Sequence, residues 1–203
     1  MSEGRGSASA PAFFPAMKIP LLFCALAAAL PGHAATVVIG NGTGRLIMQI
    51  GSTGATVNQV NFSVPGANVG NGTAVTSSNV TPASPTCPAN SVLIDVQARS
   101  QNWRRRTATL TADSSAPLTT GTFTIPFTQM SWVSSTPGGG PNGCLNAPIT
   151  IPSGTFTGAA GQSLVSFATS RRACVCAQFS YLNQSVVSAG TYTGRVTYTL
   201  AMP

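Results

Sequence analysis

Beyond residue 34 the chain carries almost none of the side chains that catalyse reactions. It contains no histidine, no lysine and no glutamate there, and its carboxylate side chains are those of Asp95 and Asp113. General acid–base catalysis and most hydrolytic nucleophiles depend on the missing residue types. The composition therefore predicts a structural or binding module, without cofactor, metal site or catalytic residue, and argues against an enzyme.

The two aspartates are the remaining candidates for chemistry. Two carboxylates that flank a glycosidic bond can cleave it. However, Asp95 lies in a run of alternating apolar and polar residues, which favours a strand position beside an arginine. Asp113 precedes two serines, a pattern typical of an Asx turn at a strand end. We therefore expect structural roles for both.

Four cysteines follow residue 34, namely Cys87, Cys144, Cys174 and Cys176. An even number in an exported chain predicts two disulfides, and a four-cysteine zinc site is the alternative. In an extended strand, Cys174 and Cys176 share one face with Cα atoms ~6.6 Å apart. That distance is at the long limit for a disulfide. We predict that one of the two pairs with Cys87 and the other with Cys144.

The basic residues suggest an anionic partner. Arg104, Arg105 and Arg106 follow Trp103, and residues 35–203 hold eight arginines against two aspartates, a net charge of +6. Such a charge attracts acidic glycans or lipopolysaccharide, whereas export argues against nucleic acid. A solvated loop or a charge-protected edge strand is the alternative. Trp103 is a candidate for stacking on a sugar ring or for the core.

Trp132 is the second tryptophan that has a face large enough to stack on a sugar ring. It sits in a strand-like run, Phe123–Trp132. Large aromatic side chains are highly buried on average. We therefore predict that Trp132 belongs to the core.

Residues 17–34 have the pattern of a secretory signal peptide. Lys18 precedes a short apolar run, and small residues stand before the predicted cleavage site after Ala34. The run is shorter than the ~20 residues that span a bilayer. We predict export to the periplasm, the outer surface or a fimbrium, and a mature chain without a transmembrane span. Residues 1–16 do not resemble a signal sequence, so we interpret them as a non-native extension and Met17 as the true start.

The rest of the chain, residues 35–203, suits a single domain. No stretch shows a capped 3.6-residue apolar period, whereas short alternating runs between turn residues predict an all-β, mostly antiparallel sandwich or barrel stapled by disulfides. The predicted strands are Arg45–Ile50, Val57–Val64, Ser91–Ala98, Thr107–Ala112, Thr122–Phe127, Ser163–Ala168, Cys174–Leu182 and Thr191–Leu200.

The two ends of this domain have distinct patterns. Tyr192, Gly194, Val196, Tyr198 and Leu200 alternate with polar residues, as in a strand with one buried face. At the other end, a short apolar segment that begins at Ala35 precedes a flexible Gly-Asn-Gly hinge.

The leader, the composition and the last strand resemble the subunits of chaperone–usher pili. The last strand of such subunits often reads Gly-x-Tyr-x-x-x-Val-x-Tyr, here Gly190, Tyr192, Val196 and Tyr198. The resemblance implies an incomplete immunoglobulin-like β-sandwich, a periplasmic chaperone and other pilus-type subunits as partners. It also implies a role in cell adhesion or fibre structure.

In that mechanism, Val37 and Ile39 of one copy complete the next by filling a groove beside the face that carries Tyr192, Val196 and Tyr198. The alternative is a stand-alone periplasmic or extracellular β-sandwich module that binds an anionic or carbohydrate ligand. Residues 35–40 would then be a frayed terminus or an ordinary first strand.

Overall fold

The computed structural model describes residues 36–41, 44–51, 59–81, 83, 86–100, 106–138 and 149–203. The chain divides into two units, residues 1–30 and 31–203, and every described residue belongs to the second. The predicted extension and leader lie outside the described residues, as do Trp103, Arg104, Arg105 and Cys144. No helix in the described part is long and apolar enough to cross a membrane.

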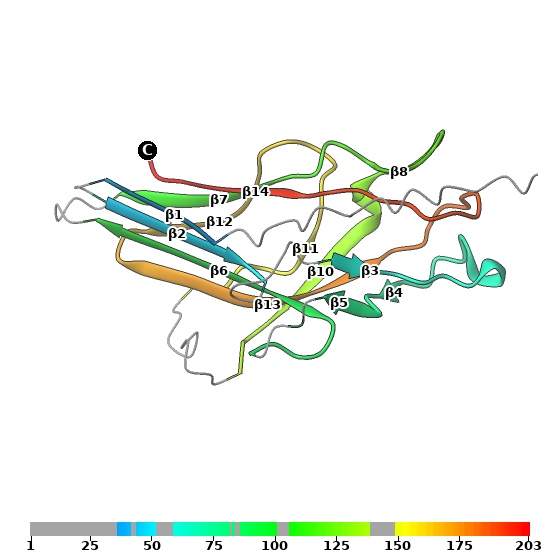
Figure 1. Ribbon diagram of the computed structural model, residues 1–203, viewed down its shortest axis with the longest axis horizontal. Coiled ribbons are helices and arrows are strands. Elements are labelled where there is room, and N and C mark those ends of the chain that lie inside the picture. The colour runs from blue at the N-terminus through cyan, green and yellow to red at the C-terminus, as the bar shows by residue number, and fades with distance from the viewer. Residues whose placement is uncertain are drawn as a thin grey trace, which may run out of the picture. The chain divides into compact units, whose positions relative to one another are not determined.

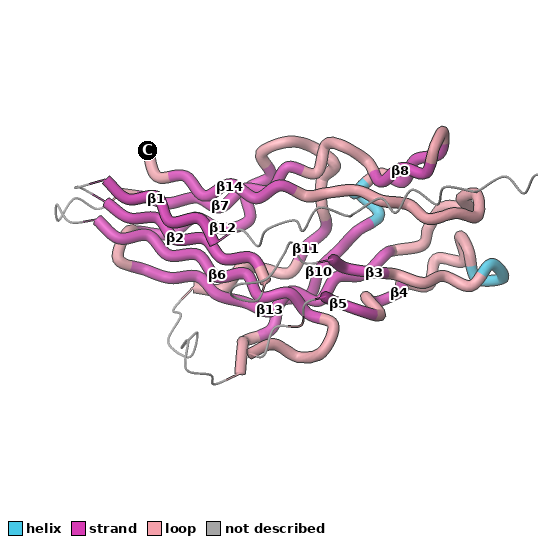
Figure 2. The backbone as a smooth tube through the Cα atoms, in the orientation of Figure 1, coloured by secondary structure: helices cyan, strands magenta, loops and turns pink. Residues whose placement is uncertain are grey.

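Antiparallel strands make up nearly all of the described regular structure (Figures 1 and 2), which confirms the all-β prediction. The main sheet has the order β1 (Thr36–Asn41), β2 (Gly44–Ile50), β6 (Ser91–Ser100), β13 (Arg171–Tyr181), β10 (Met130–Ser135) and β11 (Gly154–Thr155), and β4 (Val75–Thr76) also pairs with β13. The second sheet has the order β12 (Gln162–Ala168), β7 (Thr107–Asp113) and β14 (Thr197–Ala201).

Two short strand pairs and two single 3₁₀ turns complete the described elements. The pairs are β3 (Gln59–Asn61) with β5 (Asn79–Thr81) and β8 (Leu118–Thr120) with β9 (Phe123–Ile125), and the 3₁₀ turns are Gly66–Asn68 and Phe127–Gln129.

The two larger sheets share one apolar core. Alternate residues of β6 and of β7 are buried in the same cluster, as the two-residue period of a strand requires. These residues are Val92, Ile94, Val96 and Ala98 on β6 and Ala108, Leu110 and Ala112 on β7. The sheets therefore pack face to face, in a sandwich-like arrangement.

Trp132 lies in this core, as predicted, with 7% of its surface exposed. Its indole N–H donates a hydrogen bond to the carbonyl of Pro152 at 2.8 Å, and its ring centroid lies 4.9 Å from that of Phe156. A Cβ atom on Gly154 would lie 2.9 Å from the Trp132 ring, so β11 can pack against this indole only with glycine at that position.

The predicted and observed strands differ most at the C-terminal end. The predicted strand Thr191–Leu200 is wrong over its first half, because β14 begins at Thr197. Its partner β7 ends at Asp113, and Pro117, which follows, has no N–H to donate. Among the described residues, pairing of this segment recurs as a single bridge between Thr119 and Thr193.

Two further strands differ from the prediction. Of the strand predicted at Val57–Val64, the described residues form β3, which ends at Asn61. Residues 52–58 lie outside the described part. β10 was not predicted as a separate strand.

Candidate functional site

Asp95 is held by an arginine, as its sequence position predicts. Nε and Nη2 of Arg172 on β13 donate hydrogen bonds to Oδ1 and Oδ2 of Asp95 on β6, at 2.7 and 2.6 Å. The hydrogen bond to this carboxylate raises the pKa of Arg172. Paired guanidinium–carboxylate bonds of this kind fix the geometry of both partners, so the pair connects two neighbouring strands.

Asp113 forms the predicted Asx turn at the end of β7. The backbone N–H and the hydroxyl of Ser115 both donate to Asp113 Oδ1, at 3.0 and 2.6 Å. These hydrogen bonds lower the pKa of Asp113. Asp95 and Asp113 thus lie on strands of different sheets, each with its own partner.

A disulfide joins Cys87 to Cys176 on β13, which is one of the two pairings predicted for Cys87. Cys174 is also disulfide-bonded. Its predicted partner, Cys144, lies outside the described residues, so that pairing stays a prediction. Zinc binds thiolates, and at Cys87 and Cys176 the structure has the disulfide instead. With Leu93, Cys174 and Cys87 form a second apolar cluster, separate from the core.

The C-terminal strand β14 lies at the edge of its sheet (Figure 1). It pairs with β7 from Thr197 opposite Asp113 to Ala201 opposite Thr109. Among the described strands none pairs with its other side. An edge strand presents backbone N–H and C=O groups that have no partner in the sheet, and an added strand can bind them.

The apolar side chains of β14 are only partly covered. Tyr198 and Leu200 pack against the core but are half-buried, whereas Leu110 and Ala112 on the neighbouring β7 are 0% exposed. Burial still raises the pKa of the Tyr198 hydroxyl. The core is therefore more exposed to solvent at β14 than at the neighbouring strand β7.

Tyr192 and Val196, which precede β14, also pack against the core and are half-buried. The Tyr192 hydroxyl donates to the carbonyl of Ser188 at 2.9 Å. Burial raises the pKa of Tyr181, a buried tyrosine of β13. The structure thus brings the three residues predicted from the last strand, Tyr192, Val196 and Tyr198, onto the margin of one core.

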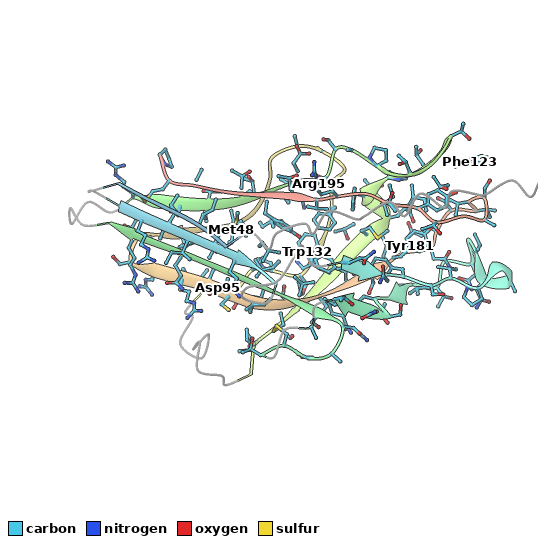
Figure 3. The ribbon with its side chains drawn as sticks, viewed as in Figure 1. Met48, Asp95, Phe123, Trp132, Tyr181 and Arg195 are labelled. Atoms are coloured by element: carbon cyan, nitrogen blue, oxygen red, sulfur yellow. A yellow bond between two sulfur atoms is a disulfide. The ribbon has the colours of Figure 1, made fainter. Side chains whose placement is uncertain are left out.

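β2 carries a second half-buried apolar row. Leu46, Met48 and Ile50 pack against the same core without being fully buried (Figure 3 labels Met48). β2 and β14 approach each other, and a Cβ atom on Gly44 would lie 2.9 Å from the Met202 side chain. The two incompletely covered rows therefore belong to the same side of the sandwich, one on each sheet.

The apolar N-terminal segment forms β1 and pairs with β2 of the same chain. The register sets Val37 opposite Met48 and Ile39 opposite Leu46. Residues 36–41 are thus a strand and not a frayed terminus. Sequence reasoning identified this segment as apolar but did not predict its pairing with β2.

The arginines expected to contact an anionic surface are only partly described. Arg106 is exposed, whereas Arg104 and Arg105 lie outside the described residues. Sequence reasoning missed Arg45, which the register of β2 sets opposite Arg99. No local signal connects two residues that far apart in the chain.

No protein-family model, no curated protein and no solved structure matches the chain.

Proposed function

We propose that the chain is an exported structural or adhesive β-domain, a pilus-type subunit that assembles by strand complementation. One observation carries this proposal: the last strand, β14, has a strand partner on one side among the described residues and a half-covered apolar row. In strand complementation a segment of another chain joins such an edge, and its alternate side chains complete the core.

The strand order supports an incomplete immunoglobulin-like sandwich. Immunoglobulin domains pack a sheet of strands A, B, E and D against a sheet of strands C, F and G. β2, β6, β13 and β10 follow the order A, B, E and D, while β7 and β14 correspond to C and F. The G position falls on the free side of β14, and none of the described strands occupies it. β12, on the far side of β7, is an addition to this scheme.

The N-terminal segment is the proposed donor. Thr36–Asn41 is apolar, forms a strand, and already pairs with β2 beside the proposed acceptor edge. Exchange of the same strand between two copies preserves the pairing with β2, so it costs little. Exchange is favourable because the donated strand also contacts β14 of the neighbouring copy. Before exchange, an open edge of this kind requires protection, which is the role of the proposed periplasmic chaperone.

A peptide-capture experiment tests the proposal. A labelled peptide of residues 35–41 should bind saturably to a chain that lacks those residues. The same peptide with Val37→Asp and Ile39→Asp should bind about 100-fold more weakly, because a carboxylate cannot be buried without a partner. Fluorescence anisotropy measures both affinities. Equal binding of the two peptides, or no binding to a chain that circular dichroism shows to be folded, would refute the proposal.

The pairing of β1 with β2 within one chain favours a second candidate, the stand-alone β-sandwich module. In that case β1 is a permanent first strand, and the edge of β14 stays open to solvent. This candidate requires a chain that is monomeric at every concentration, whereas strand exchange requires oligomers that form as the concentration rises.

A further inference from the structure

Exposed arginines from four elements gather at one end of the sandwich. They lie near the start of β2, near the end of β6, just before β7 and at the start of β13: Arg45, Arg99, Arg106 and Arg171. The register sets Arg45 directly opposite Arg99, and Arg171 opposite Ala98. We call these four residues the basic end.

Backbone hydrogen bonds connect the two sheets at the basic end. The turn between β12 and β13 contains Thr169, whose N–H donates to the carbonyl of Arg106 at 2.8 Å, and Ser170, whose N–H donates to the carbonyl of Ala98 at 2.7 Å. Ser170 adopts a positive φ of 67° in this turn. Arg106, just before β7, is thereby fixed beside the arginines of the main sheet.

The charge of the basic end is not neutralised by carboxylate side chains. Within the described part of the chain, the one ion pair between side chains joins Asp95 to Arg172. Asp113 lies at the opposite end of β7 from Arg106. Like charges directly opposite each other on neighbouring strands destabilise a sheet, so the Arg45–Arg99 pair has an energetic cost.

Charged residues can protect the edge of a sheet from pairing with another chain, but that role does not explain the energetic cost of the Arg45–Arg99 pair. β6 lies between β2 and β13, and β13 lies between β6 and β10. Arg99 and Arg171 therefore belong to interior strands, where no edge needs a charge to prevent pairing. A group of exposed cations that costs stability and guards no edge is better explained by an anionic partner.

We propose that the basic end binds an acidic polysaccharide that carries sulfate or carboxylate groups along its chain. Every cationic side chain after residue 34 is an arginine, and the planar guanidinium binds two oxygens of such a group at once. Arg45 and Arg99 lie directly opposite each other and share one face of the sheet, whereas Arg171 lies opposite Ala98 and projects from the other face. Cations on both faces of this end of the sheet suit a polymer with repeating charges better than a single small anion.

Duplex DNA is the competing polyanion. Proteins that read DNA insert a helix or a two-stranded ribbon into a groove, whereas strand ends and a tight turn form the basic end. The acidic polysaccharide is therefore the partner that this geometry favours. This inference does not depend on whether the chain polymerises.

Heparin, a sulfated polysaccharide, is the probe for the test. The full chain should bind heparin oligosaccharides at low salt and lose affinity steeply as salt rises. Arg45→Ser should weaken binding about fivefold, and Arg45→Ser, Arg99→Ser and Arg171→Ser together about 100-fold. The matched control is Arg195→Ser, which removes one exposed arginine away from the basic end (Figure 3) and should change the affinity less than twofold.

Thermal unfolding checks that the variants remain folded. Arg45→Ser should not lower the melting temperature, because it removes a like-charge contact. If Arg195→Ser weakens heparin binding as much as Arg45→Ser does, only net charge is involved and the proposed site is wrong. If a DNA duplex of the same charge binds as tightly as heparin, selectivity for a polysaccharide is wrong.

Discussion

Deletion of residues 35–41 is expected to abolish the formation of oligomers while the β-domain stays folded. The segment supplies the strand that exchanges between copies, whereas β6, β7 and β13 supply fully buried core residues such as Val96, Leu110 and Val175. The intact chain should form dimers and larger species as its concentration rises. Size-exclusion chromatography with light scattering measures both chains, and circular dichroism checks that the deleted chain keeps its β structure.

Substitutions in the intact chain separate strand exchange from damage to the fold. Val37→Asp with Ile39→Asp should prevent oligomers as fully as the deletion does, because the donor side chains must be buried in the neighbouring copy. Val38→Asp is the matched control, since Val38 alternates with these two residues along the strand. An intact chain that is monomeric at all concentrations, or a deleted chain that still forms oligomers, would favour the stand-alone module.

Loss of the Cys87–Cys176 disulfide should be the most destabilising change that leaves the proposed acceptor edge intact. The bond joins residues 89 positions apart. In the chain-entropy account, a loop of that size stabilises the fold by about 4–5 kcal/mol. Cys87→Ser with Cys176→Ser should therefore lower the free energy of unfolding by about that amount, as measured by urea denaturation.

Two controls isolate the effect of the cross-link. Cys87→Ala with Cys176→Ala avoids a buried hydroxyl at position 176, which is 0% exposed. Reduction of the unmodified chain removes this bond, together with the disulfide of Cys174, without a substitution. If the free energy of unfolding fell by less than about 1 kcal/mol in both controls, the disulfide would not be a main source of stability. Peptide capture at β14 should persist, because Cys176 lies on a strand of the other sheet.

The strands of the core could be predicted from sequence because the order of apolar and polar residues within each strand shows which positions are buried. In β7 buried positions alternate with more exposed ones, and in β6 both faces are buried from Ser91 to Val96. A two-residue period is readable without a partner. The Asx turn at Asp113 follows from equally local chemistry. An arginine beside Asp95 was predicted, but not that it is Arg172, which lies 77 residues further along the chain.

The features that matter most for the candidate site depend on pairing between distant segments. β14 starts at Thr197 because β7 ends at Asp113, and the alternation of the C-terminal residues continues past that point. The basic end collects Arg45, Arg99 and Arg171 through the registers of three strands. The pattern of one strand does not show which distant strand it pairs with, and a shift of one residue in register moves every side chain to the other face, so these features required the structure.

Amide hydrogen exchange of the deleted chain, with and without the 35–41 peptide, tests the central claim most directly. In the free chain, the amides of Thr197–Ala201 that face away from β7 should exchange rapidly, because they lie on an open edge. The peptide should slow exchange in both Thr197–Ala201 and Gly44–Ile50, since the added strand lies between β14 and β2. Protection confined to Gly44–Ile50, with no change in Thr197–Ala201, would contradict strand complementation at β14.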